Sequence, residues 1–284
     1  MNLSVSEEKI KKIIHSNFGR ETSVLGAHPV SGGNINDCFK VVTSIGSFFL
    51  KFSDKGDAKM FMCEAMGLSL IKENVLSLSV PKVLSYSTDY LLMEFVENRD
   101  KNNLFWENFG RGVSEMHKTT RTCFGLNYDN FIGNLSQKNN FENKWSDFFI
   151  NQRLLPQLCL SGFSSSLLFS FDKLFLKIES LFPEELPSLL HGDLWSGNFL
   201  FGPSFPVVID PSVYFGFREM DIAMSSLFGG FNSRFYDSYN ELNPLLHGWK
   251  DRLDLCNLYP LLVHHNLFGG GYYKQIKSVL YRFV

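Results

Sequence analysis

The chain has 284 residues, 44% of them hydrophobic and 20% charged, and a formal net charge of −2. It is long enough to bury a sizeable core, and its charge gives no reason to expect nucleic acid or an anionic membrane as a partner. The five cysteines are scattered and include no C-x-x-C pair, which argues against a disulfide framework or a zinc site. The N-terminus has no apolar run, and no stretch approaches ~18 apolar residues, which argues against a signal peptide and a membrane-spanning helix. These features favour a cytoplasmic protein.

The first hundred residues predict an N-terminal helix followed by strands with one inserted helix. Residues 4–18 place Ile10, Ile13 and Ile14 on one helical face, and Ser4 with Glu7 fits a capping box. The elements expected next are two strands around a glycine turn within residues 29–43, a strand that ends near Lys51, a helix over 57–73 with Asp57 near its N-cap, and strands over 81–86 and 90–96.

The pattern becomes helical after this point, with a single interruption. Apolar residues recur at three- and four-residue spacing over 107–120, 143–160, 165–182 and from Arg218 onward, and residues 189–211 predict a loop followed by a hairpin. We therefore expect an α+β protein of two lobes. Residues 1–96 form a small antiparallel-sheet lobe with one main helix, and residues 97–284 form a larger, mostly helical lobe.

The interruption contains the most informative motif. HGDLWSGN (191–198) has the spacing H-x-D-L-x-x-x-N, which is the catalytic-loop spacing of protein kinases. A carboxylate such as Asp193 orients and deprotonates an attacking hydroxyl, and the amide oxygen of Asn198 is a ligand for a hard cation. Asp210, after the strand-like VVI, is the expected second magnesium ligand. A turn-rich loop without chemistry is the alternative.

Phosphoryl transfer also needs a lysine and a glutamate from the small lobe. Lys51 follows FFL at the end of a predicted strand, as the lysine of the V-A-I-K motif does, and Glu64 lies in the following predicted helix. Alone, each residue is more typical of a solvated surface charge. Together with the loop, they predict a phosphate-holding ion pair.

Two further segments have weaker nucleotide-binding features. The turn SGGNIND allows backbone amides to approach a phosphate through Gly32, Gly33 and Asn34, but Gly-Gly-Asn is also ordinary hairpin chemistry. The end of the last small-lobe strand is expected to form a hinge whose backbone pairs with an adenine edge, or simply an interlobe connector; its residues are Glu94, Phe95 and Val96.

Two aromatic residues of the motif have open assignments. Trp195, beside the expected base, either stacks on an acceptor sugar or faces the core. His191 is expected to hold the loop by hydrogen bonds rather than to take part in the chemistry.

With these residues in place, the chain resembles the fructosamine kinase (ketosamine-3-kinase) family, which belongs to the aminoglycoside-phosphotransferase-like branch of the protein-kinase-like fold. The resemblance covers nearly the whole chain and is strongest at HGDLWSGN. Its other parts are, in order, FGLNYDNFIG (124–133) with Gln137, WSDFFINQRLLPQ (145–157), IDPSVYFGFREMDIAM (209–224) and HHNLFGGGY (264–272).

The resemblance implies an enzyme that uses ATP and Mg²⁺ to phosphorylate a sugar hydroxyl of a ketosamine, the glycation product of an amine. It implies a base at Asp193, magnesium ligands at Asn198 and Asp210, a phosphate-holding pair at Lys51 and Glu64, a nucleotide hinge at 94–96, and a bracing acid at Asp221. Two positions depart from the family pattern. Phe217 stands where His is more usual, and Asn34 with Ile35 replaces a cysteine-bearing turn, which argues against redox control there.

The spacing after Asp210 restricts the acceptor. Only ten residues separate Asp210 from Asp221, and Gly192 stands where protein kinases have Arg. A peptide-docking activation segment does not fit this spacing, so we expect a small-molecule or glycated-amine substrate. Separately, we expect a monomer or homodimer. The alternatives are a kinase of the same fold for an aminoglycoside, choline or another small alcohol, and a non-catalytic nucleotide-binding protein.

Overall fold

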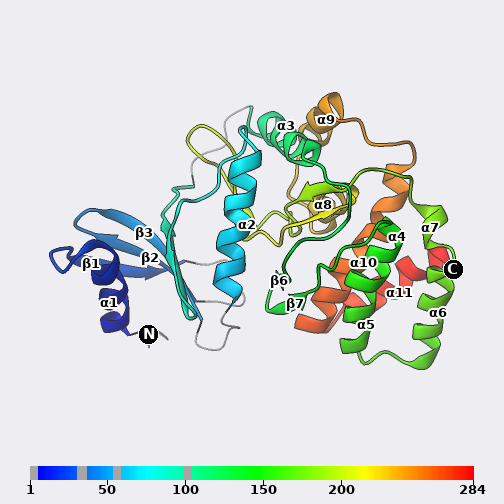
Figure 1. Ribbon diagram of the computed structural model, residues 1–284, viewed down its shortest axis with the longest axis horizontal. Coiled ribbons are helices and arrows are strands. Elements are labelled where there is room, and N and C mark those ends of the chain that lie inside the picture. The colour runs from blue at the N-terminus through cyan, green and yellow to red at the C-terminus, as the bar shows by residue number, and fades with distance from the viewer. Residues whose placement is uncertain (1–5, 31–36, 54–58, 99–103) are drawn as a thin grey trace.

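The computed structural model describes residues 6–30, 37–53, 59–98 and 104–284 (Figure 1). Gly32, Gly33 and Asn34 of the predicted phosphate-binding turn lie outside the described residues, as do Ser4 and Asp57.

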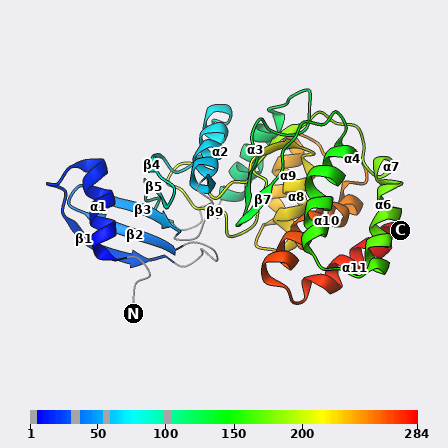
Figure 2. The same ribbon diagram turned by 60° about the horizontal axis from the view of Figure 1, so that its bottom comes forward.

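The small lobe is a five-stranded antiparallel sheet in the order β1-β2-β3-β5-β4. Figures 1 and 2 show α1 at the far side of this sheet and α2 between the sheet and the helices of the large lobe. The elements are α1 (Glu7–Phe18), β1 (Val24–Pro29), β2 (Asp37–Thr43), β3 (Gly46–Phe52), α2 (Met60–Asn74), β4 (Val83–Tyr86) and β5 (Tyr90–Glu94).

The predicted small-lobe elements are present, but the first strand was misplaced, because β1 spans Val24–Pro29 and the first two strands were both expected within 29–43. Gly26 and Pro29 obscure this strand in the sequence, since both residue types are uncommon in strands. The helix α2 ends one residue later than predicted, at Asn74, and the other elements are shorter. The capping box was wrong, because α1 begins at Glu7 and its N-cap is Ser6, whose side chain accepts from the backbone N–H of Lys9. A serine at either position supplies the same capping oxygen, so composition alone does not choose between them. The last strand ends at Glu94 rather than at Val96.

The helix α2 joins the two lobes. Its residues Phe61, Ala65 and Leu68 pack with Leu91 and Met93 of the sheet. One turn later, Ile71 belongs to the large core of the helical lobe. Residues three and four apart share a helical face, so these side chains form one stripe along α2. The first turns of this stripe contact the sheet, and the next turn contacts the core of the helical lobe. Side chains on α2 are therefore held at the junction of the two lobes.

The large lobe is mostly helical around one aromatic-rich core. Its elements are α3 (Phe105–Lys118), β6 (Asn130–Ile132), β7 (Leu135–Gln137), α4 (Trp145–Phe148), η1 (Phe149–Leu154), α5 (Leu155–Leu160), α6 (Ser165–Phe175), α7 (Ile178–Leu181), β8 (Ser188–Leu190), β9 (Phe199–Leu200), β10 (Val207–Val208), β11 (Tyr214–Gly216), α8 (Glu219–Leu227), α9 (Ser233–Leu242), α10 (Trp249–Phe268) and α11 (Tyr272–Phe283).

Three features of this lobe differ from the prediction. The helix over 143–160 contains a π-helical segment, η1, and the helix over 165–182 breaks after Phe175, where Leu176 is 89% exposed. The hairpin of β6 and β7 was not predicted, because three-residue strands are too short to show a period of two. The hairpin of β9 and β10 was predicted within residues 189–211.

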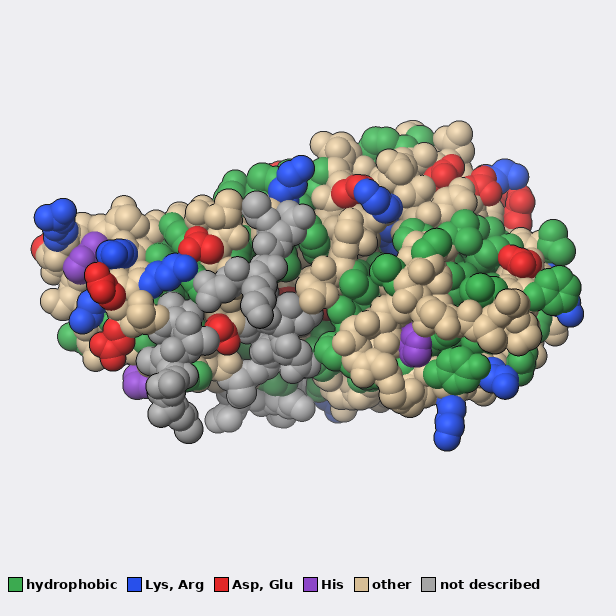
Figure 3. Space-filling view, turned by 90° about the horizontal axis from the view of Figure 1, so that it is seen from below, with side chains coloured by type: hydrophobic (Ala, Val, Ile, Leu, Met, Phe, Trp, Pro, Cys, Tyr) green, Lys and Arg blue, Asp and Glu red, His purple; other side chains and the backbone are tan. Residues whose placement is uncertain are grey.

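The division into lobes of residues 1–96 and 97–284 stays a prediction, although the five-stranded sheet ends at Glu94 and α3 begins at Phe105. Within the described part of the chain, no helix combines the length and the apolar character needed to span a bilayer. On the face shown in Figure 3, acidic and basic side chains are interspersed over the small lobe.

Candidate active site

A cavity of about 360 Å³ lies between the two lobes. Its lining includes five residues that the sequence singled out for phosphoryl transfer, which come from β3, α2, the loop after β8 and the turn before β11. They are Lys51, Glu64, Asp193, Asn198 and Asp210. The structure therefore brings together side chains that are up to 159 positions apart in the sequence.

On one side of the cavity, a lysine joins two carboxylates. The Nζ atom of Lys51 lies 2.9 and 3.0 Å from the two carboxylate oxygens of Glu64 and 2.7 Å from Oδ1 of Asp210. Lys51 is 5% exposed. We call these three residues the charged wall. A lysine held in this way presents a fixed positive charge to an anionic ligand.

The charges of this wall depend on one another. Burial opposes the charge on Lys51, but Asp210 and Glu64 raise its pKa well above the usual range. Burial would also raise the pKa of Asp210, yet the Lys51 ammonium holds it below its ordinary value. Burial raises the pKa of Glu64, and the charge of Asp210 also raises it, while the Lys51 ammonium opposes the shift. Near neutral pH, Lys51 and Asp210 are therefore ionised.

The carboxylate of Asp193 lies in the same cavity, next to Asn198. The amide Nδ2 of Asn198 donates to Oδ2 and to the backbone oxygen of Asp193, both at 2.9 Å. Burial is the main cause that raises the pKa of Asp193 to about 7; the hydrogen bond from Asn198 opposes this shift, and the charges of Asp210 and Asp221 contribute to it. A carboxylate with a pKa near 7 is well suited to act as a general base at neutral pH.

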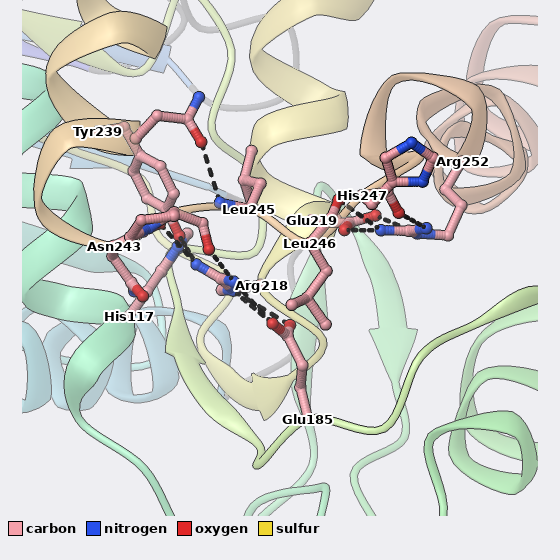
Figure 4. A network of polar contacts seen from close by, with 12 residues as sticks. His117, Glu185, Arg218, Glu219, Tyr239, Asn243, Leu245, Leu246, His247 and Arg252 are labelled. Carbon is pink, nitrogen blue, oxygen red and sulfur yellow. Dashed lines mark hydrogen bonds and ion pairs between the residues drawn. The ribbon is translucent and has the colours of Figure 1, made fainter.

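Asp221 holds the loop that carries Asp193 through two hydrogen bonds to its backbone. Its two carboxylate oxygens accept from the backbone N–H groups of His191, at 2.7 Å, and Gly192, at 2.9 Å. Oδ2 of Asp221 also lies 3.1 Å from Nε2 of His117, whose other ring nitrogen is 2.8 Å from the hydroxyl of Tyr239. Figure 4 shows His117 and Tyr239 together with Arg218, which donates to Glu185. Asp221 thus has the bracing position that the resemblance implied.

His191 holds the loop, as expected for a structural residue. Its Nε2 lies 3.0 Å from the carbonyl oxygen of Ile209, and its Nδ1 accepts from the backbone N–H of Asp193 at 3.3 Å. These partners suit a neutral imidazole with the proton on Nε2. Burial lowers the pKa of His191, which favours the same neutral form. The ring therefore ties the Asp193 loop to the strand that leads to Asp210.

The backbone at Gly192 explains why no side chain stands there. Gly192 has φ of 82°, and a Cβ at this position would lie 2.1 Å from the carbonyl oxygen of Ser212. The close approach brings the Asp193 loop against the turn that follows Asp210. Any larger residue, including the arginine of protein kinases, would push these two segments apart.

Aromatic rings also line the cavity. We call Trp195, Phe228, His264, Phe268 and Tyr272 the aromatic wall. The rings of Trp195 and Phe228 have centroids 6.1 Å apart, and His264 lies 4.7 Å from Phe228. Trp195 is half-buried and faces the cavity rather than the core, so the core-facing alternative does not hold. Its stacking on a sugar stays a prediction.

The three residues predicted to form a nucleotide hinge, at 94–96, do not line this cavity. Glu94 accepts through Oε1 from the backbone N–H of Lys82, and Nζ of Lys40 lies 4.2 Å from the ring centroid of Phe95. Glu94, Phe95 and Val96 are not among the described residues that line the cavity. Their role as a nucleotide hinge stays a prediction.

The sequence did not single out every residue that lines the cavity. The start of the β6–β7 hairpin contributes Asn130, Phe131, Ile132 and Gly133. Only the resemblance of residues 124–133, with Gln137, pointed to this segment. No spacing rule marks it, because its polar residues are buried in very short strands.

Two oxygen atoms in the cavity are suitable ligands for a magnesium ion. Nδ2 of Asn198 is used by Asp193, which leaves its amide oxygen as the group that can serve as a ligand. The carboxylate of Asp210 is a second oxygen donor in the same cavity. Among the described residues, no group of three or more His, Cys, Asp or Glu could hold a metal alone. Two oxygen donors suit Mg²⁺, which usually takes its other ligands from water and substrate phosphates.

Comparison with known proteins identifies close relatives. The family model for fructosamine kinase matches residues 6–284. A probable ketoamine kinase of Enterococcus faecium is 38% identical over 90% of this chain and 94% of its own length. The chloroplastic protein-ribulosamine 3-kinase of Arabidopsis thaliana is 34% identical over 98% of this chain and 88% of its own length.

Solved structures agree with this match. The crystal structure of a Thermobifida fusca protein assigned as a fructosamine-3-kinase has a TM-score of 0.88 and 31% identity, over 97% of this chain and 98% of that one. A gentamicin complex of an aminoglycoside phosphotransferase has a TM-score of 0.63 and 14% identity, over 99% and 95% of the two chains. The second likeness shows the shared protein-kinase-like fold.

Proposed function

The chain belongs to the fructosamine kinase family, and on that premise we propose that it transfers the γ-phosphoryl group of ATP to a sugar hydroxyl of a ketosamine. The observation that carries this proposal is the meeting of Asp193 with the charged wall in one interlobe cavity. Phosphoryl transfer requires little covalent chemistry from the protein and depends on such positioned charges.

Each residue of the site has a distinct part in the reaction. Asp193 accepts a hydrogen bond from the attacking sugar hydroxyl and takes up its proton as the new bond to phosphorus forms. Lys51, fixed by Glu64, holds the phosphate oxygens in line. Asn198 and Asp210 would hold Mg²⁺, which, when bound, neutralises phosphate charge. Asn198 also keeps the Asp193 carboxylate oriented toward the acceptor through its Nδ2 hydrogen bond.

The aromatic wall supports a ketosamine over an aminoglycoside. An aminoglycoside carries several ammonium groups and calls for several carboxylates around it. Here the described acids of the cavity are Glu64, Asp193 and Asp210, and two of them are engaged by Lys51. Aromatic faces pack against the apolar side of a sugar ring and attract the single ammonium of a ketosamine.

The surroundings of the site also favour a small-molecule or glycated-amine acceptor. Asp210 is followed within eleven positions by Asp221, which braces the catalytic loop, so no long peptide-docking segment fits between them. The five cysteines all lie in the described part of the chain and form no disulfide, which supports a reducing compartment, and we place the enzyme in the cytoplasm. Removal of glycation products from amines or proteins is the role that follows from this chemistry.

The test is ADP release with Mg²⁺ and ATP against fructosyl, ribulosyl and erythrulosyl amines, with aminoglycosides and choline as competing acceptors. We expect activity on at least one ketosamine and none with Asp193→Ala. Activity on aminoglycosides alone would reject the proposed substrate and keep the kinase fold. No ADP release with any acceptor would reject the function.

A further inference from the structure

A buried polar network lies beneath the turn that carries Asp210. It consists of three amides and one arginine, and none of its members is more than 3% exposed: Asn130, Gln137, Asn139 and Arg153. Buried polar groups are costly unless each is hydrogen-bonded. This network therefore needs extensive partners, and two of the groups it binds are carbonyl oxygens of the catalytic turn.

Gln137 and Asn130 contact the turn directly. Nε2 of Gln137 donates to the carbonyl oxygen of Ser212 at 3.0 Å, and Nδ2 of Asn130 donates to that of Val213 at 2.8 Å. From the opposite side, the backbone N–H of Ser212 donates to the carbonyl oxygen of His191 at 2.8 Å. The turn is thus held between the Asp193 loop and the β6–β7 hairpin.

The orientation of both amides is fixed by further partners. The hydroxyl of Tyr259 donates to Oε1 of Gln137 at 2.7 Å, which leaves the amide nitrogen to face Ser212. Oδ1 of Asn130 accepts from Gln137 at 2.8 Å and from Asn139 at 2.9 Å. Each amide therefore has its oxygen and its nitrogen committed, and the network permits one arrangement.

Arg153 anchors the far end of the network. Its Nη2 donates to Oδ1 of Asn139 at 2.8 Å, and its guanidinium lies 3.9 Å from the ring centroid of Tyr214. Tyr214 begins β11, directly after the turn. Arg153 itself is in η1, a π-helical segment, and such segments occur frequently at functional sites. The network therefore contacts the turn at Ser212 and Val213 through its amides, and the residue directly after the turn, Tyr214, through Arg153.

The turn needs this support because its backbone is strained. Asp210 has φ of 54°, and it is the only non-glycine residue in the described part of the chain with positive φ. Such a conformation is unfavourable for a residue other than glycine and persists only where the surrounding structure determines it. We propose that Gln137, with Asn130, is a positioning residue that holds this strained turn so that the Asp210 carboxylate faces the nucleotide side of the cavity. This inference rests on the proposed function, because the ligand of Asp210 is the cation that accompanies ATP.

The experiment compares two buried glutamines. Gln137→Met keeps the size of the side chain and removes the donor to Ser212. Gln157→Met is the matched control, because Gln157 is 2% exposed and accepts from Asn266, away from the turn. Binding of a fluorescent ATP analogue is measured with Mg²⁺ and with EDTA, below the unfolding temperature that is recorded for each variant.

We expect Mg²⁺ to tighten nucleotide binding in the wild type and in Gln157→Met. In Gln137→Met we expect about ten-fold of this tightening to be lost, as for other residues that orient metal ligands, with unchanged affinity in EDTA. Tyr259→Phe serves if Gln137→Met does not fold. It frees the Gln137 amide from one hydrogen bond and should lose about two-fold or more of the tightening.

Two outcomes contradict the inference and separate it from the proposed function. Full Mg²⁺ tightening in folded Gln137→Met, or in folded Tyr259→Phe where that variant replaces it, would show that the turn holds Asp210 without the network. An equal loss in Gln157→Met would show a general effect of destabilisation instead. A wild type without any Mg²⁺ tightening would overturn the proposed function as well, since the cation would have no part in nucleotide binding.

Discussion

The two walls of the interlobe cavity are built on different principles. The charged wall is three side chains within hydrogen-bond distance of one another, and each sets the ionisation of the others. The aromatic wall consists of rings in loose contact, and its members Phe228 and Phe268 are 38% and 50% exposed. Asp193 lines the same cavity, two positions before Trp195 of the aromatic wall. Under the proposed function, we expect Asp193 and the charged wall to carry out the phosphoryl transfer and the aromatic wall to select the acceptor.

Removing the Asp193 carboxylate should have the largest effect on activity. Asp193→Ala eliminates the base and should lower kcat by ~10³ or more, because general-base catalysis contributes up to ~10⁴. Nucleotide affinity should stay within about two-fold, since the charged wall remains. Steady-state kinetics and nucleotide titration check both parts. A variant that keeps a tenth of wild-type kcat would deny Asp193 this role.

Breaking the charged wall should cost slightly less. Lys51→Met leaves Glu64 and Asp210 without their shared cation and should lower kcat/KM for ATP by ~10²–10³. Lys144→Met is the control, because Nζ of Lys144 lies 2.8 Å from Oε1 of Glu179 and neither residue is among the described residues that line the cavity. Equal losses in the two variants would contradict the assignment of Lys51.

Breaking the aromatic wall should change acceptor binding alone. Trp195→Ala should raise KM for the ketosamine about ten-fold, the size expected from loss of ~1.5 kcal/mol of aromatic contact, and leave KM for ATP unchanged. Trp249→Ala is the control, because Trp249 is also half-buried but lies outside the residues that line the cavity. If KM for ATP rises instead, the two walls do not divide the substrates as proposed.

The pH dependence sharpens the comparison. Because burial raises the pKa of Asp193 to about 7, the base becomes protonated as pH falls, and kcat/KM should decline below about pH 7. The decline should approach ten-fold per pH unit. A profile that stays flat to pH 5 would show that Asp193 is ionised throughout or has no part in the rate.

The smallest expected effect is on stability. The folded-state pKa of Asp193 is raised above its unfolded value, so the folded state binds the proton more tightly and loses stability as pH rises from about 4 to about 7. Asp193→Asn removes this loss and should unfold a few degrees higher than wild type at pH 8. The difference should shrink as pH is lowered toward 5. A variant that is less stable at pH 8 would contradict the stated cause of the shift.

The charged wall and the Asp193 loop could be predicted from the sequence because their residues follow local rules. Asp193 and Asn198 lie in one motif, Asp210 follows an apolar strand, and Lys51 and Glu64 are thirteen positions apart on a strand and the next helix. Each position has a spacing or an element that marks it. Their meeting in one cavity required only that the two lobes close on each other.

The aromatic wall and the buried network could not be predicted in this way. Phe228 and Phe268 look like any of the 29 phenylalanines of the chain until the helices are placed. Gln137 and Arg153 are of types that usually face solvent, and their burial depends on partners more than 70 and 60 positions away, such as Ser212 and Tyr214. No local pattern encodes such pairs.

The most direct test of the central claim is ³¹P NMR of the product formed from ATP and a ribulosyl or fructosyl amine. We expect one new phosphate-ester resonance, coupled to a single proton of the sugar. It should grow in step with ADP and be absent with Asp193→Asn. Inorganic phosphate as the only new phosphorus species beside ADP, or an ester that Asp193→Asn forms at the wild-type rate, would contradict the central claim.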